Sequence, residues 1–279
     1  MSLLNFILNL IGLLLWVNWR ALAFKERVPY RSTLLHTLRS AEANPVRRWR
    51  YLAGLLVLLL LRAWLYGQLG SALSWVPAID LHAIAIPFRA DQPWRMTFFS
   101  FLSFGGALAL FYLWLLLLSV VNRAAPDTQP VQHLVRLHLG PVERWPAFVK
   151  FALPPALALM IWLALHPLFV WHGLLPDGHG AALVAQQGIV LGVASFLSWK
   201  FLIIAMLGAH LVNSYVYLGR SPLWDFASLT ARHLLQPLAW IPLRVSKVDF
   251  APLLGIALVV AAAHFAEQGL VAVFKRLPF

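Results

Sequence analysis

The sequence predicts an all-α, polytopic transmembrane helix bundle of about six helices. Of its 279 residues, 61% are hydrophobic and 11% are charged, whereas charged residues make up about 25% of an ordinary soluble domain. The mean hydropathy is +0.76. Six apolar stretches also match the roughly 17 to 25 residues with which a helix crosses a bilayer. We expect the helices at residues 3–19, 51–73, 96–121, 151–171, 188–217 and 250–270.

The first stretch, residues 3–19, is expected to be a retained helix. A secretory signal peptide has positive charge before its apolar region. No positive charge precedes this stretch, although Ala21 and Ala23 imitate a cleavage site. We therefore interpret it as the first transmembrane helix.

Charge in the connections orients the helices. Residues 20–50, 123–150 and 220–249 carry eight, four and four Lys or Arg, against two Asp or Glu each. Lys and Arg in short loops stay on the cytoplasmic side. The sequence therefore predicts a multi-pass protein of the cell (inner) membrane with these three loops cytoplasmic and both termini extracytoplasmic. The lipid bilayer accounts for the net charge of +12, and no nucleic-acid partner is expected.

The second and third basic loops repeat one pattern. In each, an Arg is followed at intervals of five residues by two prolines, then by a Lys and a further Pro. This predicts a helix-loop-helix unit that occurs two or three times, with residues 1–95 as a degenerate copy and residues 96–187 and 188–279 as clearer copies. The matched residues are Arg136, Pro141, Pro146, Lys150 and Pro155 in the second loop and Arg232, Pro237, Pro242, Lys247 and Pro252 in the third.

The third loop contains a distinctive set of residues, which are Ser221–Trp224, Thr230, Leu234–Leu235, Pro237, Pro242, Arg244 and Val248–Leu253. This set resembles the conserved segment of the YggT family of integral membrane proteins. Ser221 and Ala251 stand where that family usually has Asn and Ser. The resemblance implies a protein of helix hairpins. Relatives have been linked to osmotic and ion homeostasis, to membrane and nucleoid organisation in division and, in a chloroplast member, to attachment of haem to a cytochrome b.

The basic loops also supply candidate binding residues. Prolines fix the loop backbone, so guanidinium groups can be held ready for lipid phosphates or an acidic partner. The alternative is that the prolines only break the helices while the charges set topology. Asp249 is expected to be an N-cap or first-turn anion of the sixth helix. The candidate binding residues are Arg136, Arg232, Arg244 and Lys247.

Two cations lie inside predicted membrane helices. Arg62 and Lys200 are near the helix centres, where a cation costs about 2.5 to 3.5 kcal/mol on insertion. Such a cation normally faces the bundle interior or water. The alternatives for both residues are snorkelling or a structural ion pair on the one hand, and contact with a substrate, ion or cofactor on the other. Lys200 is expected to pair with Glu267, with His264 as an intermediate.

Other chemistry has little support in the sequence. His166 and His264 follow the matched prolines by eleven and twelve residues, and facing imidazoles can hold haem, but no haem-attachment motif accompanies them. The chain has no Cys, and no Gly-rich phosphate cradle, Ser-His-Asp order or His-Glu-x-x-His motif is present. We expect no cofactor, no metal site and no enzymatic activity.

The leading hypothesis is a non-catalytic membrane protein that organises or assists assembly of another membrane complex through its basic cytoplasmic loops. Its partner would be a membrane protein or a second copy of the chain. One alternative is a small transporter or channel-like protein in ion or osmotic homeostasis that uses Arg62 and Lys200. It ranks lower because matching helices show no Gly or Pro break of the kind that transporters use. The other alternative is a haem-handling factor.

Overall fold

The computed structural model describes residues 2–25, 45–73, 76–81, 85–88, 92–123, 130–175, 180–215, 221–240, 244–245 and 248–277. Most of these residues are helical, so the predicted all-α class is confirmed. Within the described residues, six helices are long and apolar enough to cross a membrane, and each overlaps one predicted stretch. They are Leu3–Leu22, Arg48–Gly70, Pro93–Val121, Ala147–Trp171, Ala181–Tyr215 and Ala251–Arg276. The chain is therefore a multi-pass membrane protein.

The chain forms two compact units. The first contains Met1–Ile79 and Pro87–Ala109, and the second contains Asp80–Ile86 and Leu110–Phe279. The boundary falls inside the long helix α3 (Pro93–Val121), so each unit receives one end of that helix.

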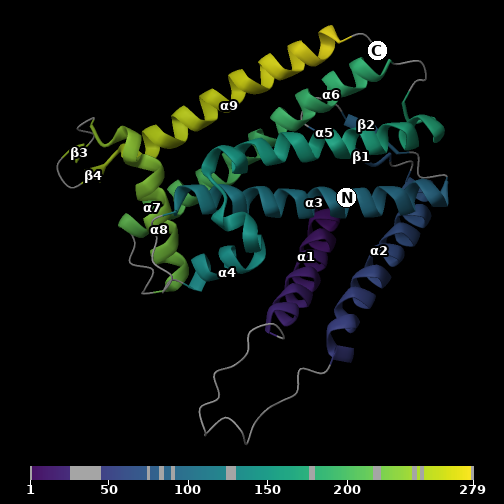
Figure 1. Cartoon of the computed structure of the whole chain (residues 1–279), viewed down its shortest axis with the longest axis horizontal. Coiled ribbons are helices and arrows are strands. Elements are labelled where there is room, and N and C mark those ends of the chain that lie inside the picture. The colour runs from purple at the N-terminus through teal and green to yellow at the C-terminus, as the bar shows by residue number, and fades with distance from the viewer. Residues whose placement is uncertain are drawn as a thin grey trace, which may run out of the picture. The chain divides into compact units, whose positions relative to one another are not determined.

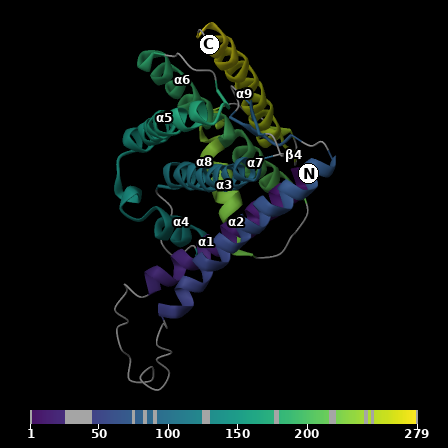
Figure 2. The ribbon, with the colours of Figure 1, turned by 90° about the vertical axis from the view of Figure 1, so that its right-hand side faces the viewer.

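The first unit is built from α1 (Ser2–Lys25), α2 (Pro45–Leu73) and the N-terminal part of α3. α1 and α2 lie side by side (Figures 1 and 2). Leu55, Leu59 and Phe104 form its buried apolar cluster. Two short strands, β1 (Ala78–Asp80) and β2 (Ala85–Pro87), lie in the connection between α2 and α3.

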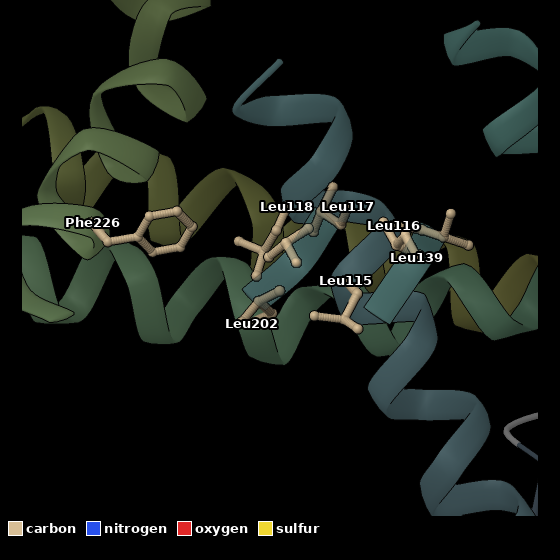
Figure 3. Close-up of a cluster of buried hydrophobic side chains, with 8 residues drawn as sticks. Leu115, Leu116, Leu117, Leu118, Leu139, Leu202 and Phe226 are labelled. Atoms are coloured by element: carbon tan, nitrogen blue, oxygen red, sulfur yellow. The ribbon is translucent and has the colours of Figure 1, made fainter. Parts of the chain in front are cut away.

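The second unit contains the C-terminal part of α3 and all later elements. Its cluster of buried apolar side chains combines α3 with α4, α7 and α8, and Figure 3 shows Leu202 and Phe226 directed toward Leu118 of α3. The elements are α4 (Pro130–Leu139), the 3-10 helix η2 (Gly140–Arg144), α5 (Ala147–Trp171), α6 (Ala181–Ala194), η3 (Ser195–Ser198), α7 (Trp199–Tyr215), α8 (Pro222–Leu235), η4 (Gln236–Leu238), β3 (Arg244–Val245), β4 (Val248–Asp249) and α9 (Ala251–Arg276).

The second and third basic loops contain short helices that the sequence analysis treats only as loop. α4 and α8 are amphipathic, because apolar residues recur on one face and basic residues lie in their last turns. Ser221 caps α8, with its hydroxyl accepting from the Leu223 amide at 3.4 Å. Each short helix follows a long one and precedes a 3-10 turn and then another long helix. This shared order agrees with the proposed repeat, which stays a prediction.

The fifth span is interrupted, which the sequence analysis did not expect. The 3-10 segment η3 (Ser195–Ser198) separates α6 from α7. Ser195 Oγ donates to the Gly192 carbonyl (2.6 Å), and Ser198 Oγ donates to the Ser195 carbonyl (2.7 Å). The expectation considered only Gly and Pro, whereas serine hydroxyls can also compete for backbone carbonyls and distort a helix.

Two tryptophans fasten α3 to this interruption. Trp114 Nε1 donates to the Ser198 carbonyl (3.2 Å), and Trp199 Nε1 donates to the Leu113 carbonyl (3.0 Å). The two bonds run in opposite directions between the same helices. An indole N–H usually finds a partner when buried, so this pair fixes the interruption against α3.

α5 and α6 pack closely because glycines of α6 face α5. A Cβ on Gly192 would lie 2.8 Å from the Pro155 Cα, and one on Gly188 would lie 2.8 Å from Leu159 Cδ1. Gly188 and Gly192 therefore form a small-residue pair that lets the two helices approach closely. At Gly105 of α3, no atom of the described residues lies within 4 Å of such a Cβ.

We predict that Gly192→Ala destabilises the protein by about 1 to 3 kcal/mol, because backbone atoms of α5 would have to move. Gly208→Ala is the matched control, since its Cβ would have no neighbour within 4 Å. The control should be neutral or should stabilise by up to about 1 kcal/mol through helix propensity. Thermal unfolding in detergent compares the two, and equal midpoints would contradict the close α5–α6 approach.

Candidate functional site

Arg62 of α2 is buried among neutral polar groups, as expected of an intramembrane cation. It is 1% exposed. Its Nε donates to Ser100 Oγ (2.9 Å), its Nη1 donates to Asn9 Oδ1 (2.6 Å), and its Nη2 donates to the Ser100 carbonyl. Ser100 Oγ in turn donates to the Leu59 carbonyl (2.7 Å). The guanidinium group therefore joins α1, α2 and α3.

The polar network continues around Asn5 of α1. Tyr66 and Ser103 both donate to Asn5 Oδ1, at 3.4 and 3.3 Å, and Asn9 Nδ2 donates to Ser103 Oγ (3.2 Å). The sequence contains no Asp or Glu in residues 2–25, 45–73 and 92–123. Arg62 is therefore held by amide, hydroxyl and carbonyl dipoles. The sequence analysis found Arg62 but missed these partners, because single Asn and Ser residues in apolar helices carry no distinctive spacing.

We predict that Asn9→Ala destabilises the protein by about 1 to 3 kcal/mol, because it removes an acceptor from a buried charged donor. Asn18→Ala is the matched control on the same helix, since Asn18 is an exposed donor to its own helix at Leu14, and we expect a change within about 0.5 kcal/mol. Denaturant titration in detergent measures both. Combining Asn9→Ala with Arg62→Met should recover part of the loss, and full additivity would contradict the contact.

The predicted ion pair in the second unit is confirmed. Lys200 Nζ of α7 lies 3.2 Å from Glu267 Oε2 of α9, with the two side chains 24% and 44% exposed. Lys200 is the second residue of α7, just after the interruption of the fifth span. The suggested intermediate is wrong, because His264 Nε2 instead lies 2.9 Å from Gln268 Nε2 on its own helix.

We predict that Glu267→Gln lowers the thermal midpoint more than Lys200→Met does, because it leaves a cation unpaired inside the span. The double variant should recover part of the loss, with a coupling energy of about 0.5 to 3 kcal/mol. Thermal unfolding of the wild type, both single variants and the double variant provides the cycle. A coupling energy of zero would show that the ion pair contributes nothing.

A third polar cluster lies where α3, α4 and α5 meet, and the sequence analysis identified only part of it. Glu143 of η2 accepts from the Ser119 hydroxyl and forms ion pairs with Arg136 (3.7 Å) and Lys150 (3.6 Å). Lys150 Nζ also donates to Ser119 Oγ (2.6 Å) and the Glu143 carbonyl (2.7 Å). Ser119 is fully buried, and Lys150 is 4% exposed. Because Lys150 is paired with a carboxylate and Ser119 is closed to solvent, this Ser-Lys contact is a structural brace.

Asn122, at the end of α3, connects that helix to α8. Its Nδ2 donates to Thr230 Oγ1 (2.8 Å), and its Oδ1 accepts from His233 Nδ1 (2.9 Å). Asn213, at the corresponding place in α7, donates to Ser228 Oγ of α8 (3.3 Å). Each asparagine follows a valine near the end of its helix, as Val121-Asn122 and Val212-Asn213. This shared pair is a sequence signal of the repeat, but it does not reveal the contact with α8.

We call α4, η2, α8, η4 and the turn at residues 239–240 the loop platform, because α4 and α8 pack against each other and against α3. Arg136 is partly buried beside Glu143, whereas Arg232 is exposed on α8. The equivalent loop arginines therefore have different surroundings. Exposed residues of the platform also include Arg144 and Trp240.

Except for Pro155, which lies inside α5, the described prolines of the repeat lie in 3-10 turns or at helix starts. Pro141 and Pro237 lie in η2 and η4, and Pro146 is the N-cap of α5. Pro252 is buried in the first turn of α9. Pro242 and Lys247 lie outside the described residues.

The expected cap of the sixth span is wrong by one residue. Phe250 occupies the N-cap position of α9, and no side chain caps it. Asp249 lies in β4, where its backbone pairs with that of Arg244. The side chains of Asp249 and Arg244 lie outside the described part of the chain.

The two candidate haem ligands occupy different surroundings. His166 packs against Trp162 of its own helix α5, and His264 contacts Gln268 and Phe265 of α9. α6 packs against both α5 and α9. Among the described residues, no three His, Cys, Asp or Glu are grouped to hold a metal ion.

Comparison with protein-family models, with curated proteins and with solved structures finds no match for this chain.

Proposed function

We propose that this multi-pass protein has a non-catalytic role, in which the loop platform docks another membrane protein or a second copy of the chain and assists its assembly. We place the platform on the cytoplasmic side of the inner membrane, with both termini outside, because of the charge distribution of the loops. We also propose membership of the YggT family, on the residues of the third loop that resemble it.

The observation that carries this proposal is the organisation of the basic loops. Setting topology requires positive charge but no folded structure. Here α4 and α8 are packed into the buried apolar cluster, and Asn122 fastens α8 to α3. This leaves Arg232 exposed on α8 and Trp240 80% exposed in the turn that follows η4. Arg and Trp are the residue types that most often dominate protein interfaces.

The interruption of the fifth span supports the second candidate, a small transporter or channel-like protein. Transporter sites typically lie where membrane helices are broken, and η3 directly precedes Trp199 and Lys200. The lower rank of this candidate rested on the lack of a break, and the structure supplies one. In that case Lys200 and Glu267 would lie at the site, with the loop platform as its support.

Capture of partners in mild detergent, followed by mass spectrometry, tests the docking role. We predict that Arg232→Gln lowers recovery of a partner by about tenfold, because interface arginines often contribute more than 1.4 kcal/mol. Lys275→Gln is the matched control, since it removes an exposed cation at the far end of α9, and it should leave recovery unchanged. Arg232→Lys should also reduce capture, because the planar two-point contact is lost.

Equal capture by the wild type, Arg232→Gln and Lys275→Gln would overturn the docking role. A visible spectrum of the same sample tests the haem-handling alternative, which requires a Soret band. Uptake of an ion or solute into vesicles that contain the protein tests the transporter alternative. Uptake that requires Lys200 and is unaffected by Arg232→Gln would favour the transporter.

A further inference from the structure

The second unit contains a groove of about 370 Å³ between the interrupted fifth span and α9. On one side it is lined by Phe196, Trp199 and Lys200, and on the other by alanines of α9, including Ala263 and Ala266. The change of helix geometry at η3 and the short alanine side chains leave this space unfilled. Its volume falls in the range of about 300 to 1,000 Å³ that is typical of small-molecule sites.

Lys200 gives this groove its chemical character, because it is the one charged residue among those that line it. Its ammonium is partly exposed and contacts Glu267 Oε2 at 3.2 Å, and it has more N–H donors than that contact uses. Glu267 is not part of the lining. An apolar groove with a single cationic donor favours a ligand that has an apolar body and one group of hydrogen-bond acceptors, such as a carboxyl group.

The position of the groove narrows the ligand class. Lys200 and Glu267 both lie inside helices that are long and apolar enough to cross the membrane. A diacyl phospholipid keeps its charged headgroup at the interface, because a charge in hydrocarbon is costly. A long-chain carboxylic acid can instead enter in its neutral form. Its carboxyl oxygens can then accept hydrogen bonds from the Lys200 ammonium.

We propose that this groove binds a long-chain carboxylic acid from the bilayer, with its carboxyl group on Lys200 and its chain between η3 and the alanine face of α9. This site is independent of the docking role of the loop platform. The proposed site also assigns a role to the interruption of the fifth span, since a continuous helix would place Lys200 differently against α9.

A photoreactive palmitic acid bearing a diazirine on its chain tests the site on the full-length protein in detergent. Labelling should map to η3, the start of α7 and the facing turns of α9. Ala266→Trp should reduce labelling by about tenfold, because the indole fills the groove, whereas Ala261→Trp should leave it within about twofold. Ala261 is the matched control, because it is exposed on the same helix and does not line the groove.

Competition with unlabelled compounds tests which polar group the site requires. Unlabelled palmitic acid should suppress labelling, and hexadecanol should not, because it lacks a carboxyl group. Lys200→Met should weaken palmitic-acid competition by about tenfold while keeping the groove open. This second variant makes the test independent of whether Ala266→Trp folds.

Three results would overturn the proposal. One is equal labelling of Ala266→Trp and Ala261→Trp when both are folded. Another is competition by hexadecanol as strong as that by palmitic acid. The third is disulfide cross-linking of an Ala266→Cys variant to a second copy of the chain, which would show that a helix occupies the groove.

Discussion

The constraint on which this structure depends is that polar groups inside hydrocarbon must find partners within the protein. Arg62 of α2 illustrates it most strongly, since α1 and α3 supply its acceptors through Asn9 and through the hydroxyl and carbonyl of Ser100. Burying Arg62 is therefore energetically costly, but its hydrogen bonds specify one arrangement of α1, α2 and α3. Apolar contacts alone would allow these helices to slide or rotate, because lipid is as apolar as leucine.

The same constraint explains how the second unit tolerates a broken span. The interruption at η3 disturbs the backbone hydrogen bonds of a helix, and Ser195, Ser198 and Trp114 bond to carbonyls there. Trp199 adds the reciprocal bond to α3. The irregular backbone is thus supported by side chains, and Lys200 lies beside Glu267. The proposed ligand groove is a result of this arrangement.

The loop platform extends the constraint to the membrane surface. Glu143 accepts a hydrogen bond from Ser119 and forms ion pairs with Arg136 and Lys150. Asn122 joins α3 to α8. These contacts link the ends of the spans to the loops, so a partner docked on the platform would meet a preformed surface. Preorganisation of this kind lowers the entropy lost on binding, which favours a docking role over loops that only set topology.

The sequence by itself determined the six apolar spans, the basic loops and the Lys200–Glu267 pair, because length, hydropathy and the rise of a helix fix them. Only the tertiary structure decided the partners of Arg62, the role of Glu143 and the interruption at η3. These depend on which neutral residues face one another across helices, and Asn, Ser and Trp leave no periodic signal. Asn122 shows the difference: the sequence marks it as the end of a helix, whereas packing makes it the link to α8.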